Sequence, residues 1–166
     1  MLQLKTVTPQ FADFDKLSAL YHSAFPENER RPLGEMFPFL SGSGEFLALY
    51  DGETFCGFVC LLSWQDITHI LYLAIDSRLR GRGYGTGMLS AIRQRYPHSR
   101  LIADIELETA GASNNAERRQ RKHFYQKSGY RSSEVQYRWR EESYEIIVSG
   151  GDFDKVDFRS FWNAFG

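Results

Sequence analysis

The residue types and spacing of Arg80–Thr86 suit the binding of a phosphate group. This stretch reads Arg-Gly-Arg-Gly-Tyr-Gly-Thr and lies between an apolar run, residues 70–75, and a segment with helical spacing, residues 88–96. A strand, a glycine-rich turn and a helix in this order place unpaired backbone N–H groups at a helix N-terminus, where the helix dipole also favours negative charge. The three glycines would let the backbone approach a phosphate that a Cβ would keep away. The sequence therefore predicts a pyrophosphate-binding loop.

Two common phosphate-binding patterns differ from this loop. A Walker loop ends in Gly-Lys-Ser/Thr, and no lysine follows these glycines. A dinucleotide fingerprint reads Gly-x-Gly-x-x-Gly, and Thr86 stands where its third glycine belongs. That fingerprint also needs an acidic residue after the next strand, a place that Asp104 or Glu106 could take. A nucleotide-binding oxidoreductase domain therefore stays open as an alternative.

Composition narrows the class of protein. With 166 residues, of which 42% are apolar, the chain is expected to form a single domain over residues 1–166 with a substantial core. Twenty basic residues against twenty-one acidic ones give a formal net charge of −1. This balance argues against nucleic acid or an acidic membrane surface as a partner.

Sequence features also bear on location and metal content. The first residues lack the pattern of a signal peptide, and no apolar run approaches membrane-spanning length. Cys56 and Cys60 are the only cysteines and are expected to be buried thiols in a reducing compartment, which indicates a cytoplasmic protein. The four histidines share no ligand spacing, so we expect no metal site.

Hydrophobic periodicity predicts an alternating order of strands and helices. The first helix is expected to open at Pro9 with Thr8 as its cap, and to end at or before Pro26. The other predicted helices cover residues 33–40, 86–96, 116–128 and 153–165. The predicted strands cover residues 2–8, 46–50, 54–64, 66–75, 100–108, 130–139 and 144–148. The order is β-α-α-β-β-β-α-β-α-β-β followed by a terminal helix.

Two segments and this element order resemble one family. Residues 73–85 resemble the acetyl-CoA signature of the GNAT superfamily of N-acetyltransferases, Arg/Gln-x-x-Gly-x-Gly/Ala. Residues 121–130, Arg-Lys-His-Phe-Tyr-Gln-Lys-Ser-Gly-Tyr, resemble the late helix ending of that family. The resemblance spans nearly the whole chain and implies an α/β (α+β) fold with a central mixed, mostly antiparallel sheet flanked by helices. It implies transfer of an acetyl group from acetyl-CoA to a primary amine of a small molecule or peptide.

The resemblance also implies which residues bind the acetyl donor. The backbone of the strand before the glycine loop would pair with the pantetheine arm, and one of its N–H groups would polarise the thioester carbonyl. By this resemblance the strand residues are Leu73, Ala74 and Ile75, and the loop residues are Arg80, Gly81, Arg82, Gly83, Tyr84, Gly85 and Thr86.

Tyr125 is the residue expected to act as general acid, because family members commonly use a tyrosine at this position to protonate the departing thiolate. A phenol with a pKa near 10 can give its proton to a thiolate of similar basicity. For the general base we favour Glu106 and then Glu29. A water chain is the alternative, since carboxylates in such places are often only surface charges.

Several points stay open at this level. Many relatives have an asparagine about two helical turns before the tyrosine, where this chain has Arg118. Arg118 belongs to a run of basic residues that is expected to form a solvated face. No serine or cysteine stands in a nucleophile motif, so direct attack in a ternary complex is expected. A non-catalytic acyl-CoA sensor is the alternative function, and a homodimer is an open alternative for the assembly.

Overall fold

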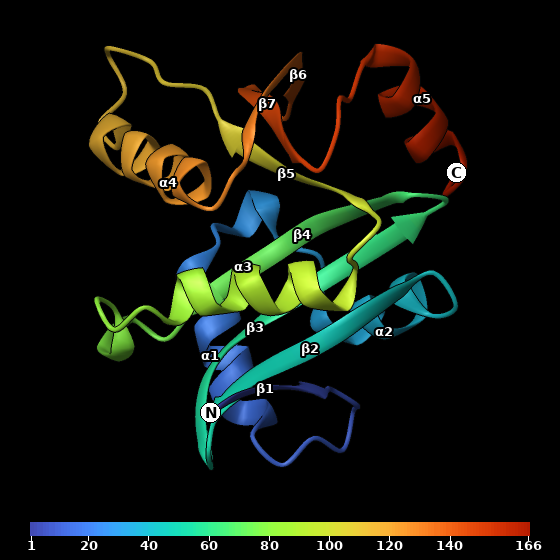
Figure 1. Cartoon of the computed structure of the whole chain (residues 1–166). Coiled ribbons are helices and arrows are strands. Elements are labelled where there is room, and N and C mark those ends of the chain that lie inside the picture. The colour runs from blue at the N-terminus through green and yellow to red at the C-terminus, as the bar shows by residue number, and fades with distance from the viewer. The chain divides into compact units, whose positions relative to one another are not determined.

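The computed structural model describes residues 1–166 and contains seven strands and five α-helices (Figure 1). The chain divides into two compact units. The first comprises residues 1–63 and 70–95, and the second comprises residues 64–69 and 96–166. Each unit has its own strands, helices and buried side chains, and each is described by itself below.

The first unit is built on β1 (Leu2–Thr6), β2 (Gly44–Asp51), β3 (Thr54–Trp64) and most of β4 (Ile67–Ile75). These strands lie in the order β1-β2-β3-β4, and β2 pairs antiparallel with both β1 and β3. The turn between β2 and β3 contains Gly52 with φ +62°, a left-handed conformation that favours glycine. Asp-Gly pairs are typical of hairpin turns, and Asp51-Gly52 joins the two strands here.

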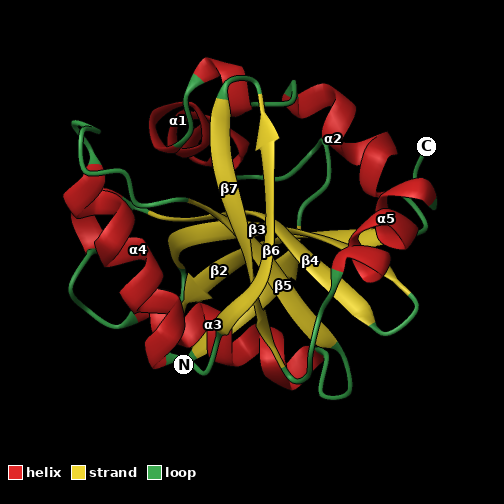
Figure 2. Ribbon diagram, turned by 90° about the horizontal axis from the view of Figure 1, so that it is seen from above, coloured by secondary structure: helices red, strands yellow, loops and turns green.

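Three α-helices cover these strands: α1 (Phe14–Ala24), α2 (Leu33–Leu40) and α3 (Tyr84–Arg95). Figures 1 and 2 show α3 on one face of the strands and α1 and α2 on the other. Apolar side chains at helical spacing point into the two layers of core between helices and strands, and the buried ones are Leu17, Tyr21, Met36, Leu40, Met88, Leu89 and Ile92. This packing of helices on both faces of the strands fixes α3, and the glycine loop lies at its N-terminus.

The start of α1 differs from the prediction. The helix begins at Phe14, whereas the sequence predicts a start at Pro9 with Thr8 as the cap. Residues 8–13 form turns instead, in which the Phe11 N–H donates to the Thr8 carbonyl at 3.0 Å. The Tyr50 hydroxyl donates to Asp13 at 2.6 Å, which ties the first helical turn to β2. This long-range contact stabilises a later helix start than the local cap signal indicates.

The second unit contains β5 (Arg100–Glu106), β6 (Arg131–Trp139) and β7 (Glu142–Ser149), in the order β5-β7-β6 with antiparallel pairs. Its helices are α4 (Asn115–Lys127) and α5 (Lys155–Asn163), which lie on either side of these strands in Figure 2. Lys122 of α4 forms an ion pair with the buried Glu145 of β7 at 2.9 Å. Phe158 of α5 packs on Tyr137 of β6 with ring centroids 5.2 Å apart.

The predicted fold class, a mixed α/β structure with a mostly antiparallel sheet, is confirmed. Several boundaries differ by one or two residues. β5 ends at Glu106 rather than residue 108, and α3 begins two residues before the predicted position. The β6–β7 turn is formed by Arg140 and Glu141, and both have positive φ. None of the helices is both long and apolar enough to cross a membrane.

Candidate active site

Two glycines of the loop adopt a backbone conformation that favours glycine. Gly81 and Gly83 have φ of +78° and +81°, in the left-handed region that other residues rarely adopt. A Cβ built on either glycine would meet no atom within 4 Å. The backbone conformation, and not steric crowding by the protein, therefore requires glycine here, and the space over the loop is open to a ligand.

The backbone N–H groups of residues 81–86 donate no hydrogen bond within the protein. The first bond of this turn is from the Gly87 N–H to the Gly83 carbonyl, at 2.9 Å. Because α3 begins at Tyr84, the N–H groups of residues 84–86 belong to the first helical turn, where the helix dipole adds positive potential. An arrangement of this kind, free backbone N–H groups at a helix start, suits a negatively charged group.

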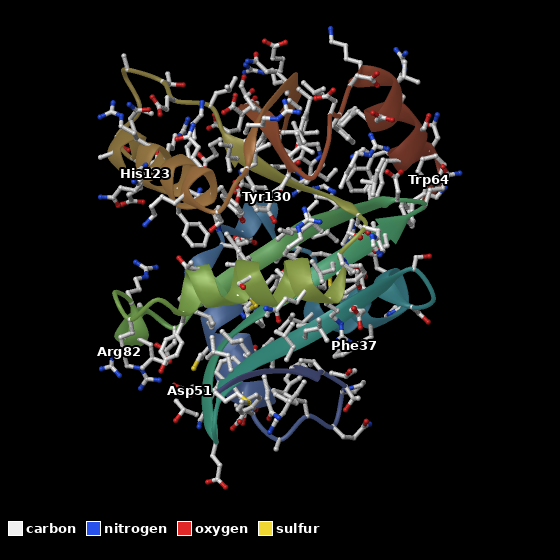
Figure 3. The ribbon with its side chains drawn as sticks, viewed as in Figure 1. Phe37, Asp51, Trp64, Arg82, His123 and Tyr130 are labelled. Carbon is white, nitrogen blue, oxygen red and sulfur yellow. The ribbon has the colours of Figure 1, made fainter.

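Side chains on both sides fix the loop in place. The Tyr84 hydroxyl donates to Asp51 at 2.7 Å, and this hydrogen bond raises the pKa of Tyr84. Before the loop, the Asp76 carboxylate accepts from the backbone N–H of Arg78 at 3.0 Å and also binds its guanidinium at 2.8 Å. Arg82 forms no ion pair, and its side chain projects away from the strands (Figure 3). Its charge is therefore available to a ligand.

The predicted strand segment Leu73–Ile75 forms the end of β4. Ala74 is buried, and a Cβ on Gly57 of β3 would lie 2.2 Å from its carbonyl oxygen, so the close approach of the two strands requires glycine. Asp76, the next residue, donates its N–H to the Cys56 carbonyl at 2.8 Å. The strand residues predicted to bind the donor and the glycine loop thus lie close together along the chain, at the same end of β4.

Glu29 lies in the same unit, in a short 3-10 turn (Glu27–Glu29) between α1 and α2. Its carbonyl accepts a hydrogen bond from the hydroxyl of Tyr72, at 2.6 Å. Tyr72 is the residue of β4 that directly precedes Leu73. The structure therefore ties the backbone of one predicted base candidate to the strand predicted to bind the donor, a link that sequence reasoning missed.

Tyr125 lies in the second unit near the end of α4 and is 7% exposed. Its ring packs edge-on against Phe124 and Tyr130, with centroids 5.1 and 5.3 Å away. Its hydroxyl makes no hydrogen bond within the protein. Burial raises the pKa of Tyr125 to about 12, although the nearby Arg121 lowers it in part. The phenol therefore stays protonated at neutral pH.

Glu106, the other base candidate, is held by two guanidinium groups of α4. Its Oε2 lies 2.8 Å from Nη2 of Arg118, and its Oε1 lies 3.4 Å from Nη1 of Arg121. Arg118 is 7% exposed and also binds Glu142 at 3.1 Å and the Asn114 amide oxygen at 2.9 Å. The expectation of a solvated basic face is therefore wrong for Arg118, because acidic groups from β5 and β7 surround it.

The two other carboxylates of this strand region have different surroundings. Asp104 accepts a hydrogen bond from the Tyr137 hydroxyl at 2.6 Å, and its Oδ1 lies 3.2 Å from Nε2 of the buried His69. Glu108 lies beyond the end of β5 and is 3.8 Å from the exposed Arg119. The structure thus gives each acidic residue of this region a basic or hydroxyl partner, and it separates Glu108 from the regular strand.

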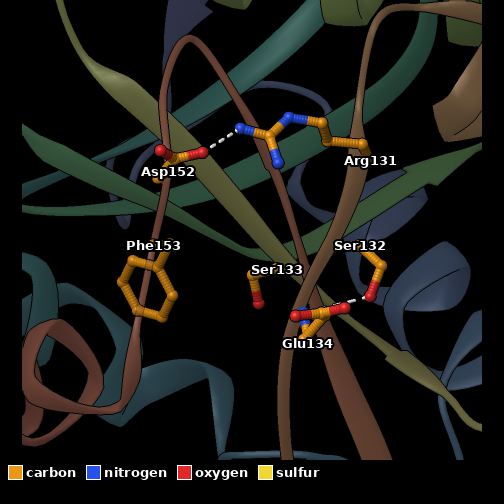
Figure 4. A pocket seen from close by; sticks show the side chains of 6 residues that line it. All are labelled: Arg131, Ser132, Ser133, Glu134, Asp152 and Phe153. Atoms are coloured by element: carbon orange, nitrogen blue, oxygen red, sulfur yellow. Dashed lines mark hydrogen bonds and ion pairs between the residues drawn. The ribbon is translucent and has the colours of Figure 1, made fainter.

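The second unit also contains an open cavity of about 460 Å³ beside β6 (Figure 4). Three of its polar side chains are already bonded within the protein, and a fourth, Ser132, accepts from backbone. Arg131 forms an ion pair with Asp152, the Ser133 hydroxyl donates to the Ile146 carbonyl at 2.6 Å, and the Ser132 hydroxyl accepts from the Glu134 N–H at 3.1 Å. The cavity therefore offers few groups for a ligand, and the glycine loop is the stronger candidate.

A model of the acetyltransferase (GNAT) family matches residues 14–130, which is more than half of the chain and includes both the glycine loop and Tyr125. The chain belongs to the acetyltransferase (GNAT) family. As a GNAT acetyltransferase it is an enzyme, and the predicted family resemblance is confirmed. The oxidoreductase alternative is thereby set aside. Among curated proteins, none matches this GNAT chain in sequence.

Solved structures of GNAT proteins have the same fold as this GNAT chain. A GNAT-family protein from Bacteroides thetaiotaomicron has a TM-score of 0.80 and 17% identity, with 98% of this chain and 94% of that chain covered. The ribosomal-protein-S18-alanine N-acetyltransferase from Escherichia coli has a TM-score of 0.64 and 15% identity, covering 93% and 96%. A GNAT acetyltransferase from Elizabethkingia anophelis with acetyl-CoA bound has a TM-score of 0.57 and 15% identity, covering 89% and 97%.

Proposed function

We propose that this GNAT acetyltransferase transfers an acetyl group from acetyl-CoA to a primary amine of a small molecule or peptide. The observation that supports this most directly is the anion site at the start of α3, with its undonated N–H groups and two left-handed glycines. Such a site fits the pyrophosphate of coenzyme A. The similarly folded Elizabethkingia anophelis protein has acetyl-CoA bound, which agrees with this assignment.

In this proposal the residues that bind the donor are those expected from the family resemblance. Gly81 and Gly83 let the loop backbone approach the pyrophosphate, and Arg80 and Arg82 add positive charge, since neither has an acidic partner. The backbone of Leu73–Ile75 pairs with the pantetheine arm, and one of its N–H groups stabilises the oxyanion that forms when the amine attacks the thioester.

Tyr125 is proposed as the general acid. Its hydroxyl has no partner within the protein, so it is free to donate to the sulfur of the leaving group. Burial raises its pKa to about 12 and keeps the proton on the phenol at neutral pH. Tyr125 would donate this proton to the sulfur as the bond between sulfur and the acetyl carbon breaks.

Glu106 is proposed as the general base, with Glu29 second. Arg118 and Arg121 hold the Glu106 carboxylate in one orientation, and its remaining lone pairs could accept the ammonium proton of the acceptor, directly or through water. Glu29 lies in a loop that Tyr72 holds at its backbone. The variants Glu106→Gln and Glu29→Gln distinguish the two candidates. Replacement of the true base should lower kcat, and the decrease should be largest below neutral pH, where more of the acceptor amine is protonated.

Direct attack without a covalent acetyl-enzyme agrees with the state of the cysteines. Cys56 and Cys60 are both fully buried, and burial raises the pKa of each thiol. A buried thiol with a raised pKa forms little thiolate, which is the nucleophilic species. The acetyl group is therefore expected to pass straight to the amine in a ternary complex.

The first experiment measures acetyl-CoA binding by calorimetry and coenzyme A release across a panel of amines, amino acids and short peptides. Binding together with turnover supports the proposal, and absence of acetyl-CoA binding overturns it. The competing function, an acyl-CoA sensor, predicts binding with no turnover for any amine. Tyr125→Phe then serves as the matched variant, because it should lose turnover and keep binding.

A further inference from the structure

The segment between α1 and α2 presents a guanidinium that has no acidic partner. Arg31 is exposed and forms no ion pair, although Glu27, Glu29 and Glu35 are close to it in sequence. Exposed arginines are common, so this alone says little. What distinguishes Arg31 is that both its backbone and its side chain are held in place.

Two tyrosine hydroxyls hold the backbone of Arg31. The Tyr21 hydroxyl donates to the Arg31 carbonyl at 2.6 Å and accepts from the Arg31 N–H at 2.8 Å. The same N–H lies 3.3 Å from the hydroxyl of Tyr72, which in turn donates to the Glu29 carbonyl at 2.6 Å. Tyr21 is 1% exposed, and burial raises the pKa of its phenol far above the usual value, so it remains a donor at any ordinary pH.

The side chain of Arg31 stacks on an aromatic ring. Its Cζ lies 3.7 Å from the centroid of Phe39, the residue before the last one of α2. Stacking uses the face of the planar guanidinium and leaves the N–H groups at its edge free to donate. The fixed backbone and the stacked side chain together present these donors with little conformational freedom left to lose on binding.

The position of Arg31 connects it to the donor strand. Tyr72, which bonds to residues 29 and 31, directly precedes the Leu73–Ile75 segment of β4. The Arg31 loop is therefore fastened to the same strand that is proposed to bind the thioester. A substrate group that contacts Arg31 would lie near the acetyl donor and not on a remote surface.

We propose that Arg31 binds an anionic group, a carboxylate or a phosphate, on the amine acceptor. A guanidinium with free edge donors matches both groups in a bidentate arrangement. The acceptor class is then an amine that also has a negative charge, such as an amino acid or a phosphorylated amine, and not a polycation. This inference rests on the proposed acetyl transfer and specifies its acceptor.

Matched pairs of amines test this inference. The carboxylate pair is L-leucine and L-leucinamide, and the phosphate pair is phosphoethanolamine and ethanolamine. Binding of each to the protein saturated with coenzyme A is measured by NMR titration, and acetylation of each is measured as coenzyme A release. We expect the anionic member of at least one pair to bind tenfold or more tightly, and the pair concerned identifies the anion.

Arg31→Gln should remove this preference, because glutamine keeps polar donors without the charge. Arg159→Gln is the matched control, since Arg159 is an exposed arginine of α5. Equal binding within both pairs, binding of neither member, or a preference that survives in Arg31→Gln would overturn the inference. Acetyl-CoA affinity is measured in the same variants. If the unmodified protein does not bind acetyl-CoA, the proposed function itself is overturned. If it binds acetyl-CoA but shows no preference for the anionic amines, only the proposed acceptor class is overturned.

Discussion

Arg118 and Glu106 form a 2.8 Å ion pair in which the arginine is 7% exposed and the glutamate side chain 15% exposed. The pair connects α4, the helix that contains Tyr125, with β5, the strand that contains the proposed base. Arg118 also donates to the Leu107 carbonyl at 2.8 Å and binds Glu142 of β7. One side chain thus stabilises three elements of the second unit and orients the Glu106 carboxylate.

Replacing Arg118 should therefore destabilise the protein. In Arg118→Met two partly buried carboxylates, Glu106 and Glu142, lose their shared cation, and we expect a loss of about 3 kcal/mol in the free energy of unfolding. The loss should shrink below about pH 4, where carboxyl groups take up protons. Urea unfolding at pH 7 and at pH 3 measures both. Arg119→Met is the control, because Arg119 is 67% exposed and should contribute less than about 0.5 kcal/mol.

Tyr125→Phe should remove catalysis and preserve donor binding. The variant loses only a hydroxyl that has no partner within the protein, so we expect the fold and the acetyl-CoA affinity to remain. The rate constant kcat should fall by about 100-fold or more, in line with the loss of a general acid. Steady-state kinetics with the best acceptor of the panel, together with calorimetry, check this. A kcat within a factor of two of the original would show that another group supplies the proton.

Gly83→Ala should weaken acetyl-CoA binding. At φ +81° a Cβ is strained whatever the surrounding space, and relief of this strain by a backbone shift would misplace the N–H groups of the loop. We expect roughly a tenfold or greater rise in Kd, equivalent to about 1–2 kcal/mol. Gly111→Ala is the control, because Gly111 has no positive φ and open space around it. Equal Kd values for the two variants would contradict the assignment of the loop.

The protein should lose stability above pH 10. Burial is the main cause of the raised pKa values of Tyr21, Tyr50 and Tyr125, and that of Tyr125 is raised to about 12. In the unfolded chain these phenols ionise near pH 10, so the unfolded state loses protons that the native state keeps, and stability falls as pH rises. Each such tyrosine contributes up to about 1.4 kcal/mol per pH unit within this window.

Unfolding in urea at pH 9, 10.5 and 11.5 measures this decline. Tyr125→Phe should show a shallower decline than the original protein, because one of the three phenols no longer ionises on unfolding. A free energy of unfolding that does not change between pH 9 and pH 11.5 would show that these phenols are not shielded from solvent in the native state.

Local sequence signals were enough to predict the order of the elements, the glycine loop and the family. Left-handed glycines, a hairpin turn at Asp51-Gly52 and helical spacing all act within a few residues of chain, so they are visible without the fold. Gly81 and Gly83 adopt left-handed conformations, and Gly129, with φ +90°, follows the end of α4. These features could be predicted because the backbone conformation is set by neighbouring residues.

Only the tertiary structure decided which side chains meet. The later start of α1 follows from the contact between Asp13 and Tyr50, and the burial of Arg118 follows from acidic groups on two other strands. Tyr72 reaches Glu29 and Arg31 across about forty residues of sequence. Hydrogen bonds and ion pairs of this kind depend on how strands and helices pack, and residue type and spacing alone do not specify that packing. We expect contacts of this kind to select the acceptor, whereas the family could be predicted from the glycine loop.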